Sequence, residues 1–120
     1  MKHLTIKTTN WEMTPEISSH LDEKMLAIEK LLPDPDADTL KCDVELAHVE
    51  DKEGKEWRVE MNLLVDGKVL RGEERAESLQ TGIDTVKNEI VRQLEKMRRK
   101  QSSFIRRGGA TLKDLLRFGR

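Results

Sequence analysis

The chain has few of the residues on which disulfides, metal sites and aromatic sites are built. Its 120 residues include one cysteine, three histidines, two tryptophans, two phenylalanines and no tyrosine. A single cysteine excludes a disulfide within the chain, and the histidines lack the short spacings typical of metal ligands. We therefore expect no metal site and no cofactor.

Long apolar segments and catalytic motifs are also absent from the sequence. Hydrophobic residues make up 36% of it, and no apolar run approaches the roughly 20 residues of a membrane helix. No glycine-rich phosphate-binding motif and no serine in a nucleophile elbow is present. The acidic residues at 34–38 and 73–77 fall in an expected loop and an expected first helical turn, where solvated charge is usual. We expect a cytoplasmic protein that is not an enzyme and binds neither a membrane nor a small-molecule substrate.

What the chain does contain is charge, and the charge is unevenly distributed. The net charge is −1 over the whole chain. Residues 1–86 contain 11 Lys/Arg and 20 Asp/Glu, a net of −9, whereas residues 87–120 contain 11 and 3, a net of +8. A basic segment joined to an acidic body is typical of a protein that binds a polyanion at one end.

The first third of the sequence predicts a strand followed by a helix. Apolar and polar residues alternate over residues 3–8, as in a half-buried strand. Thr14 suits the N-cap of a helix and Pro15 its first position. Apolar residues then recur every three or four positions from Ile17 to Leu32, which places them on one helix face.

Alternating patterns in the middle of the chain predict three further strands. They cover residues 40–48, 57–64 and 68–73. The Asp66-Gly67 dipeptide is typical of a two-residue hairpin turn, and this turn places Leu70 opposite Leu63.

A second, longer helix is predicted from near Glu74, with one apolar stripe from Leu79 to Met97. Gly82 within it lowers helix stability by about 1 kcal/mol relative to alanine, unless close packing requires it. The apolar pattern ends after Gln101. Each helix has a single apolar stripe, so we expect a two-layer α+β domain, β-α-β-β-β-α, with both helices on one face of a four-stranded sheet. This domain spans residues 1–101, followed by a basic tail over 102–120 with a hinge at Gly108-Gly109 and a possible short helix.

The second helix carries a cluster of cations on the face opposite its apolar stripe. Arg92, Lys96 and Arg99 lie within about 60° of one another on a helical wheel, flanked by Arg98 and Lys100. Like charges at this spacing repel each other and destabilise the helix unless an anion is present. The alternative is a solvated face, because cations near a helix C-terminus also complement its dipole.

The basic run continues into the tail, where it includes the two phenylalanines. Its further members are Arg106, Arg107, Lys113, Arg117 and Arg120. Phe104 and Phe118 lie among them. Aromatic rings interleaved with arginines stack on unpaired bases while guanidinium groups bind phosphates. An equally good interpretation is that each ring anchors the tail in a protein groove.

Two segments of the chain resemble the ribosome hibernation promoting factors, also called ribosome-associated inhibitors or sigma-54 modulation proteins. The segment IKTTNWEMTPEISSHLDEKMLAIEK (6–30) is similar to the family's opening strand and its E-[IM]-T-P-x-[IL] helix start. The segment RGEERAESLQTGIDTVKNEIVRQLEKMRR (71–99) is similar to A-E-D-x-Y-x-A-I-D-x-x-x-x-K-L-x-R-Q-L-x-K. Leu79, Gly82 and Glu89 depart from the usual tyrosine, alanine and lysine.

The resemblance implies a domain laid out like a double-stranded RNA-binding domain and a short form of the family, which we expect to be monomeric off the ribosome. Its implied partner is the small subunit of the bacterial ribosome, both rRNA and proteins, alone or in the whole ribosome. There it would occupy the decoding centre and mRNA channel, block mRNA and tRNA, and reversibly inhibit translation in stress or stationary phase. The rRNA-binding cations implied by position are Lys24 and Lys30 on the first helix and Arg92, Lys96, Arg99 and Lys100 on the second. The basic run adds Arg98, Arg106 and Arg107.

Two other functions remain open at this point. One is an RNA-binding module that acts on structured RNAs other than the ribosome. The other is a protein–protein adaptor whose tail, 112–118, docks in a partner groove. The candidate tail contacts for either are Phe104, Lys113, Arg117 and Phe118.

Overall fold

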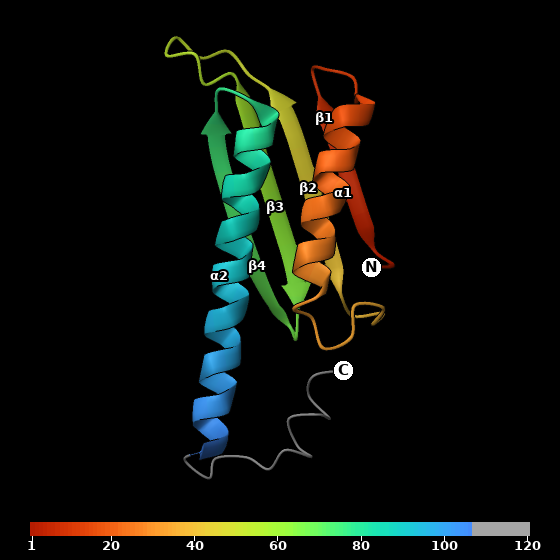
Figure 1. Cartoon of the computed structure of the whole chain (residues 1–120), viewed down its shortest axis with the longest axis vertical. Coiled ribbons are helices and arrows are strands. Elements are labelled where there is room, and N and C mark those ends of the chain that lie inside the picture. Colours follow the sequence, from red (N-terminus) through yellow and green to blue (C-terminus); the bar gives the residue numbers. More distant parts are fainter. Residues whose placement is uncertain (107–120) are drawn as a thin grey trace.

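Two helices pack against one face of a four-stranded sheet, as Figure 1 shows. The computed structural model describes residues 1–106, with the side chains of residues 1–101. The elements in chain order are β1 (Leu4–Thr9), α1 (Pro15–Glu29), β2 (Lys41–His48), β3 (Trp57–Val65), β4 (Lys68–Ala76) and α2 (Leu79–Arg106). This is the two-layer β-α-β-β-β-α arrangement that the sequence pattern predicts.

The strands lie side by side in their sequence order, β1-β2-β3-β4. β1 and β2 are parallel because α1 connects them across the sheet, whereas the pairs β2–β3 and β3–β4 are antiparallel. In the β3–β4 turn, Asp66 and Gly67 have φ angles of 51° and 74°. A two-residue turn that follows the strand twist requires left-handed conformations at both positions. The turn places Leu70 opposite Leu63, which confirms the predicted register.

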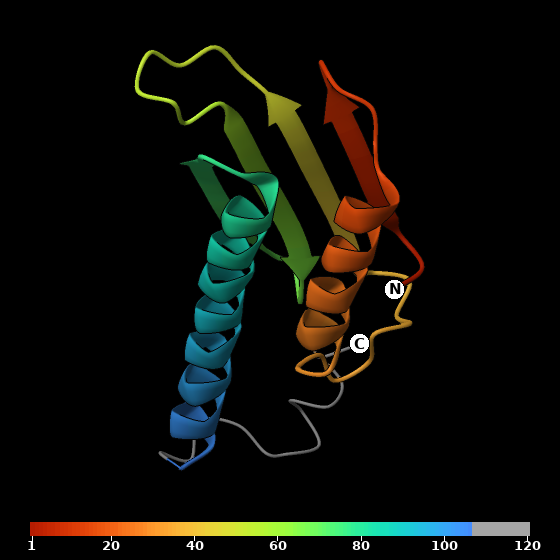
Figure 2. The ribbon, with the colours of Figure 1, turned by 45° about the horizontal axis from the view of Figure 1, so that its top comes forward.

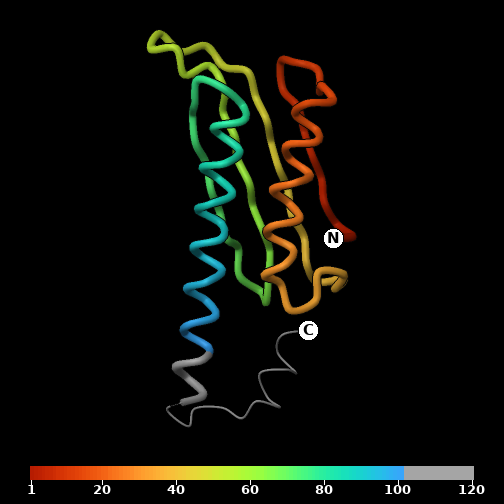
Figure 3. Tube along the Cα trace, in the orientation of Figure 1, coloured from red at the N-terminus to blue at the C-terminus, as the bar shows by residue number. Residues whose placement is uncertain are grey.

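The buried apolar side chains come from the inner faces of the two helices and of the sheet, and they form one core between the two layers. Figure 2 shows these layers from a tilted view. The N-cap is confirmed, since the Thr14 hydroxyl oxygen accepts a hydrogen bond from the backbone N–H of Ile17 at 3.3 Å, and Pro15 is the first helical residue. α2 packs over β3 and β4 and also contacts α1, and Figure 3 shows the two helices lying side by side. The largest fully buried side chains are Leu21, Ile28, Leu46, Met61, Leu63, Ile83 and Ile90.

Gly82 lies where α2 packs closely against β3. A Cβ atom at this position would lie 2.8 Å from Cγ2 of Val59 on β3, which is closer than side-chain carbons pack. Any larger residue would therefore push the helix away from the strand. Close packing explains why glycine stands here despite its low helix propensity.

The predicted start of the second helix, near Glu74, is wrong. α2 begins at Leu79, and β4 continues to Ala76, which pairs with Trp57 on β3. The strand continues because β3 offers it backbone hydrogen bonds up to that pair. Ser78 then caps the helix, since its hydroxyl oxygen accepts a hydrogen bond from the backbone N–H of Thr81 at 3.2 Å. The acidic residues at 73 and 74 therefore belong to a strand and not to a helical turn.

The helix also extends further than its apolar pattern. α2 continues to Arg106, beyond the Gln101 at which the pattern ends. The side chains of residues 98–101 are exposed, so this part of the helix forms without burial. Lysine, arginine and glutamine are strong helix formers, and their propensity accounts for the extension. The predicted hinge and short helix in residues 107–120 lie outside the described residues.

Candidate nucleic-acid interface

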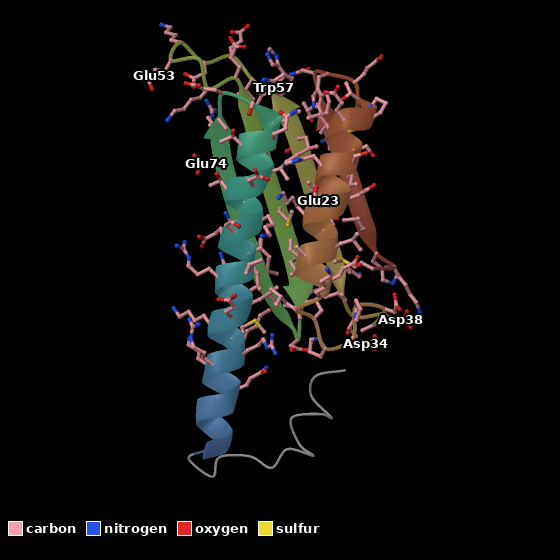
Figure 4. All side chains as sticks on the ribbon, viewed as in Figure 1. Glu23, Asp34, Asp38, Glu53, Trp57 and Glu74 are labelled. Carbon is pink, nitrogen blue, oxygen red and sulfur yellow. The ribbon has the colours of Figure 1, made fainter. Side chains whose placement is uncertain are left out.

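The C-terminal half of α2 presents a group of exposed cations, which we call the cationic segment (residues 92–100). It consists of Arg92, Lys96, Arg98, Arg99 and Lys100, all of them exposed, while Ile90 and Leu94 on the opposite face are buried. Figure 1 shows that α2 continues beyond the end of the sheet. In Figure 4, side chains with nitrogen tips stand out from this half of the helix. The segment is therefore open to a large anionic partner from several sides.

Most of the cationic segment has no internal counterion. Arg92 forms an ion pair with Glu89, one helical turn earlier. For Lys96, Arg98, Arg99 and Lys100, no carboxylate of the described part of the chain lies within 4.0 Å. Only solvent and salt screen the repulsion between these four cations. An anion that binds here therefore stabilises the helix as well as the complex.

Gln93 anchors this half of α2 to the edge of the sheet. Its Nε2 donates to the backbone oxygen of Arg71 on β4 at 2.8 Å, and its Oε1 accepts from the backbone N–H of the same residue at 3.3 Å. Nε2 also donates to Glu89 at 2.9 Å. The amide thus acts like a strand partner for β4 and sets the rotation of α2. Sequence reasoning missed this role, although Gln93 is the uncharged polar residue of the R-Q-L motif.

The two cations predicted on α1 differ in their surroundings. Lys24 is half-buried, and its Nζ lies 3.6 Å from Asp84 on α2, which also contacts Nε2 of His20 at 2.7 Å. Lys24 therefore links the two helices, and a phosphate would have to compete with Asp84 for it. Lys30 is the C-cap of α1 and is exposed. Because α1 and α2 run in the same direction (Figure 1), it lies at the same end as the cationic segment.

Two arginines on the open face of the sheet, Arg58 and Arg71, are neutralised by carboxylates, whereas the exposed Arg75 has no carboxylate of the described residues within 4.0 Å. Glu45, Glu60 and Glu73 lie directly opposite one another on β2, β3 and β4, an arrangement in which like charges repel. Arg58 bonds to Glu45 and Glu60 and lies 4.0 Å from Glu73. Arg71 contacts Glu60 at 3.2 Å and Glu73 at 2.8 Å from the other side. This charged ladder, as we call the three glutamates with Arg58 and Arg71, offers little free charge to an RNA.

The pKa values of the charged ladder follow from these contacts. Hydrogen bonds from the Thr9 hydroxyl and from Arg58 lower the pKa of Glu45. A hydrogen bond from Asn62 has the largest effect on the pKa of Glu60 and lowers it, burial opposes this shift, and the charge of Arg71 adds to the lowering. The hydrogen bond to Glu45 raises the pKa of Arg58. The charged ladder therefore stabilises the fold when its glutamates are ionised.

The remaining predicted site residues lie at or beyond the end of the described chain. Phe104 and Arg106 lie in the last turns of α2, of which the structure describes the backbone. Arg107, Lys113, Arg117 and Phe118 lie outside the described residues. Their predicted contacts with RNA or with a protein groove remain predictions.

Within the described residues, the structure gives no site for a metal and no membrane span. No group of three or more His, Cys, Asp or Glu side chains there is placed to hold a metal ion. Cys42 is buried, and burial raises the pKa of its thiol to about 12. No helix in residues 1–106 is long and apolar enough to cross a bilayer.

The chain matches a family model and is similar in fold to solved structures. The family model described as sigma 54 modulation protein / S30EA ribosomal protein matches residues 4–102. The fold is similar to that of the Thermus thermophilus Protein Y N-terminal domain, with a TM-score of 0.62 and 21% identity over 79% of this chain and 98% of that one. It is also similar to a ribosomal subunit interface protein from Coxiella burnetii, with a TM-score of 0.61 and 13% identity over 80% and 97%. The comparison with curated proteins gives no match.

Proposed function

Because the chain belongs to the sigma 54 modulation protein / S30EA ribosomal protein family, we propose that it is a ribosome hibernation factor. It binds the small ribosomal subunit at the decoding centre and mRNA channel, prevents mRNA and tRNA from binding, and so inhibits translation reversibly. The family match makes the ribosome the partner to test first. The choice of the decoding centre rests on the resemblance described above and on the charge of α2.

The observation that carries the proposal is the cationic segment. Four of its five cations have no carboxylate of the described chain within 4.0 Å, and rRNA offers a dense array of phosphates. Gln93 fixes the segment relative to the sheet, so the cations are presented in one orientation and bind with a smaller loss of conformational entropy.

The proposed mechanism is steric and involves no covalent chemistry. At 28 residues, α2 is about 42 Å long, and with α1 and the sheet it forms a wedge that fills space otherwise taken by mRNA and tRNA. The helix layer faces the RNA because the cationic segment and Lys30 lie there. The opposite face carries the charged ladder and points away. Phosphate contacts position a protein without reading bases, so rRNA shape is what it recognises.

A salt titration tests the electrostatic part of the proposal. Binding of the labelled protein to purified small subunits is measured from 50 to 300 mM KCl. If about six phosphates are contacted, log K falls against log salt with a slope of roughly −4 to −5. A flat salt dependence would contradict the proposal.

Two further measurements test the location and the specificity of binding. Chemical footprinting on the small subunit is expected to protect the decoding site, and a stoichiometric excess of protein is expected to stop cell-free translation. A generic double-stranded RNA serves as the competitor. If it displaces the protein as well as free small subunits do, the chain is a general RNA-binding module and the ribosomal assignment is wrong.

A further inference from the structure

A shallow aromatic depression lies at the end of the molecule remote from the cationic segment. It has a volume of about 280 Å³ and lies between the N-terminal ends of α1 and α2. The half-buried Trp11 and Trp57 provide its apolar surface above the buried Ile17 and Leu79, and Glu16 and Glu77 provide its charge. Figure 4 shows Trp57 at this end, above the region between the two helices. It shares no residue with the cationic segment.

The two tryptophan rings are held in fixed positions. Nε1 of Trp11 donates a hydrogen bond to the backbone oxygen of Leu46 at 2.7 Å. The Trp11 and Trp57 rings meet edge to face, with centroids 5.7 Å apart and an angle of 86° between their planes. The His48 ring also packs against Trp57, with centroids 4.7 Å apart. Both tryptophans are half-buried, so each keeps an accessible part in a surface that is already ordered.

The charge around this aromatic surface is negative. Its two charged lining residues, Glu16 and Glu77, are exposed carboxylates, and no lysine or arginine lines it. The neighbouring loop between β2 and β3 (residues 49–56) contains four acidic and two basic residues. The partial positive charge at the N-terminal ends of α1 and α2 is reduced, because Thr14 and Ser78 accept hydrogen bonds from first-turn N–H groups. An RNA phosphate would be repelled here.

We propose that this aromatic depression binds a lysine or arginine side chain from a basic, extended segment of another protein. The tryptophan faces attract the cation, the apolar rim contacts its methylene groups, and Glu16 and Glu77 neutralise it. The surface does not depend on RNA binding and goes beyond the proposed function. The molecule then has two binding ends of opposite charge, one for RNA and one for protein.

Tryptophan fluorescence reports on this site directly, because Trp11 and Trp57 are the only tryptophans of the chain. The probe is an end-blocked Gly/Arg heptapeptide with three arginines, titrated into the full-length protein without ribosomes. A Gly/Glu heptapeptide and a short oligothymidylate are titrated in parallel. We expect a saturable change in emission with the arginine peptide and none with the other two. A response to the oligothymidylate in place of the peptide would show a nucleic-acid site and overturn the proposal.

Matched variants test the carboxylates. Glu16→Gln with Glu77→Gln is expected to weaken peptide binding at least about fivefold. Asp22→Asn with Glu23→Gln removes the same charge from the exposed face of α1 and is expected to leave it unchanged. Equal losses in both double variants, or no saturable response up to 10 mM peptide, would contradict the proposal. The single variant Glu77→Gln, outside both helices, repeats the test if the first double variant unfolds.

Discussion

Arginine has opposite roles in two regions of this molecule. On the open face of the sheet, Arg58 and Arg71 are held among three glutamates of neighbouring strands. In the cationic segment of α2, Arg98 and Arg99 have no carboxylate of the described chain within 4.0 Å. These two sheet arginines stabilise the fold, and these two helix arginines are available to a partner. The number of cations on a surface therefore says less about RNA binding than whether each cation is paired.

The largest effect is expected from reversing charge within the cationic segment. Arg92→Glu with Lys96→Glu replaces two phosphate contacts by repulsion, and we expect binding to small subunits to weaken about a hundredfold. Translation inhibition should be lost with it. The melting temperature should change by less than about 2 °C, because both side chains are exposed.

The matched control reverses two exposed lysines, Lys52→Glu with Lys55→Glu, in the loop at the other end of the molecule. It changes the net charge equally and should weaken small-subunit binding less than about threefold. Equal losses in the two double variants would show that net charge, and not the cationic segment, determines binding. A large fall in melting temperature of the first variant would show that the helix face is assigned wrongly.

Reversing a paired cation should instead affect folding. Arg58→Glu places a fourth carboxylate beside the row of three, and although this carboxylate lies opposite Arg75 on β4, we expect the free energy of unfolding to fall by about 2 kcal/mol. Arg58→Met, which only removes the cation, should cost about 1 kcal/mol. Urea denaturation measures both. Arg99→Glu on α2 is the comparison and should lower the free energy of unfolding by less than about 0.5 kcal/mol. A larger decrease would show that the cations of the two regions do not differ in their contribution to stability.

Glu89 is the ion-pair partner of Arg92, and removing its charge is expected to have a smaller effect on binding to small subunits. Glu89→Gln releases Arg92 from its ion pair and keeps an oxygen to accept the hydrogen bond from Gln93. We expect about threefold tighter binding to small subunits and a steeper salt dependence. Glu95→Gln removes an equal charge from the same helix and should give a smaller gain. Equal gains would mean that the Arg92 ion pair does not limit binding.

The smallest effect concerns pH. Glu45 and Glu60 have pKa values below the ordinary 4.5 in the folded state, so the stability that they contribute is present above about pH 4.5 and is lost as the pH falls further. The stability difference between the wild type and Arg58→Met should therefore narrow between pH 5 and pH 3, by no more than about 0.5 kcal/mol in these partly exposed pairs. Urea denaturation at several pH values measures it. A constant difference would show that the ladder owes its stability to packing and not to charge.

Local pattern was enough to predict most of the fold. The Thr14 cap, the Asp66-Gly67 turn and the pairing of Leu63 with Leu70 each depend on residues close together in the sequence. The helical period also predicts that the cationic segment faces solvent, because it lies opposite the apolar stripe that contains the buried Ile90. The start of α2 could not be predicted, because β4 extends as far as its partner β3 allows.

The sequence by itself determined the order of elements, their apolar faces and the concentration of positive charge after residue 86, because these are properties of neighbouring residues. Only the tertiary structure decided which charges are free. Asp84 reaches Lys24 from the other helix, and Gln93 reaches the backbone of Arg71 from 22 residues away. Gly82 on α2 likewise packs closely against Val59 on β3, a residue remote from it in the sequence. Charge pairing and close packing depend on distances in space between residues remote in sequence, and those distances exist only once the helices lie on the sheet.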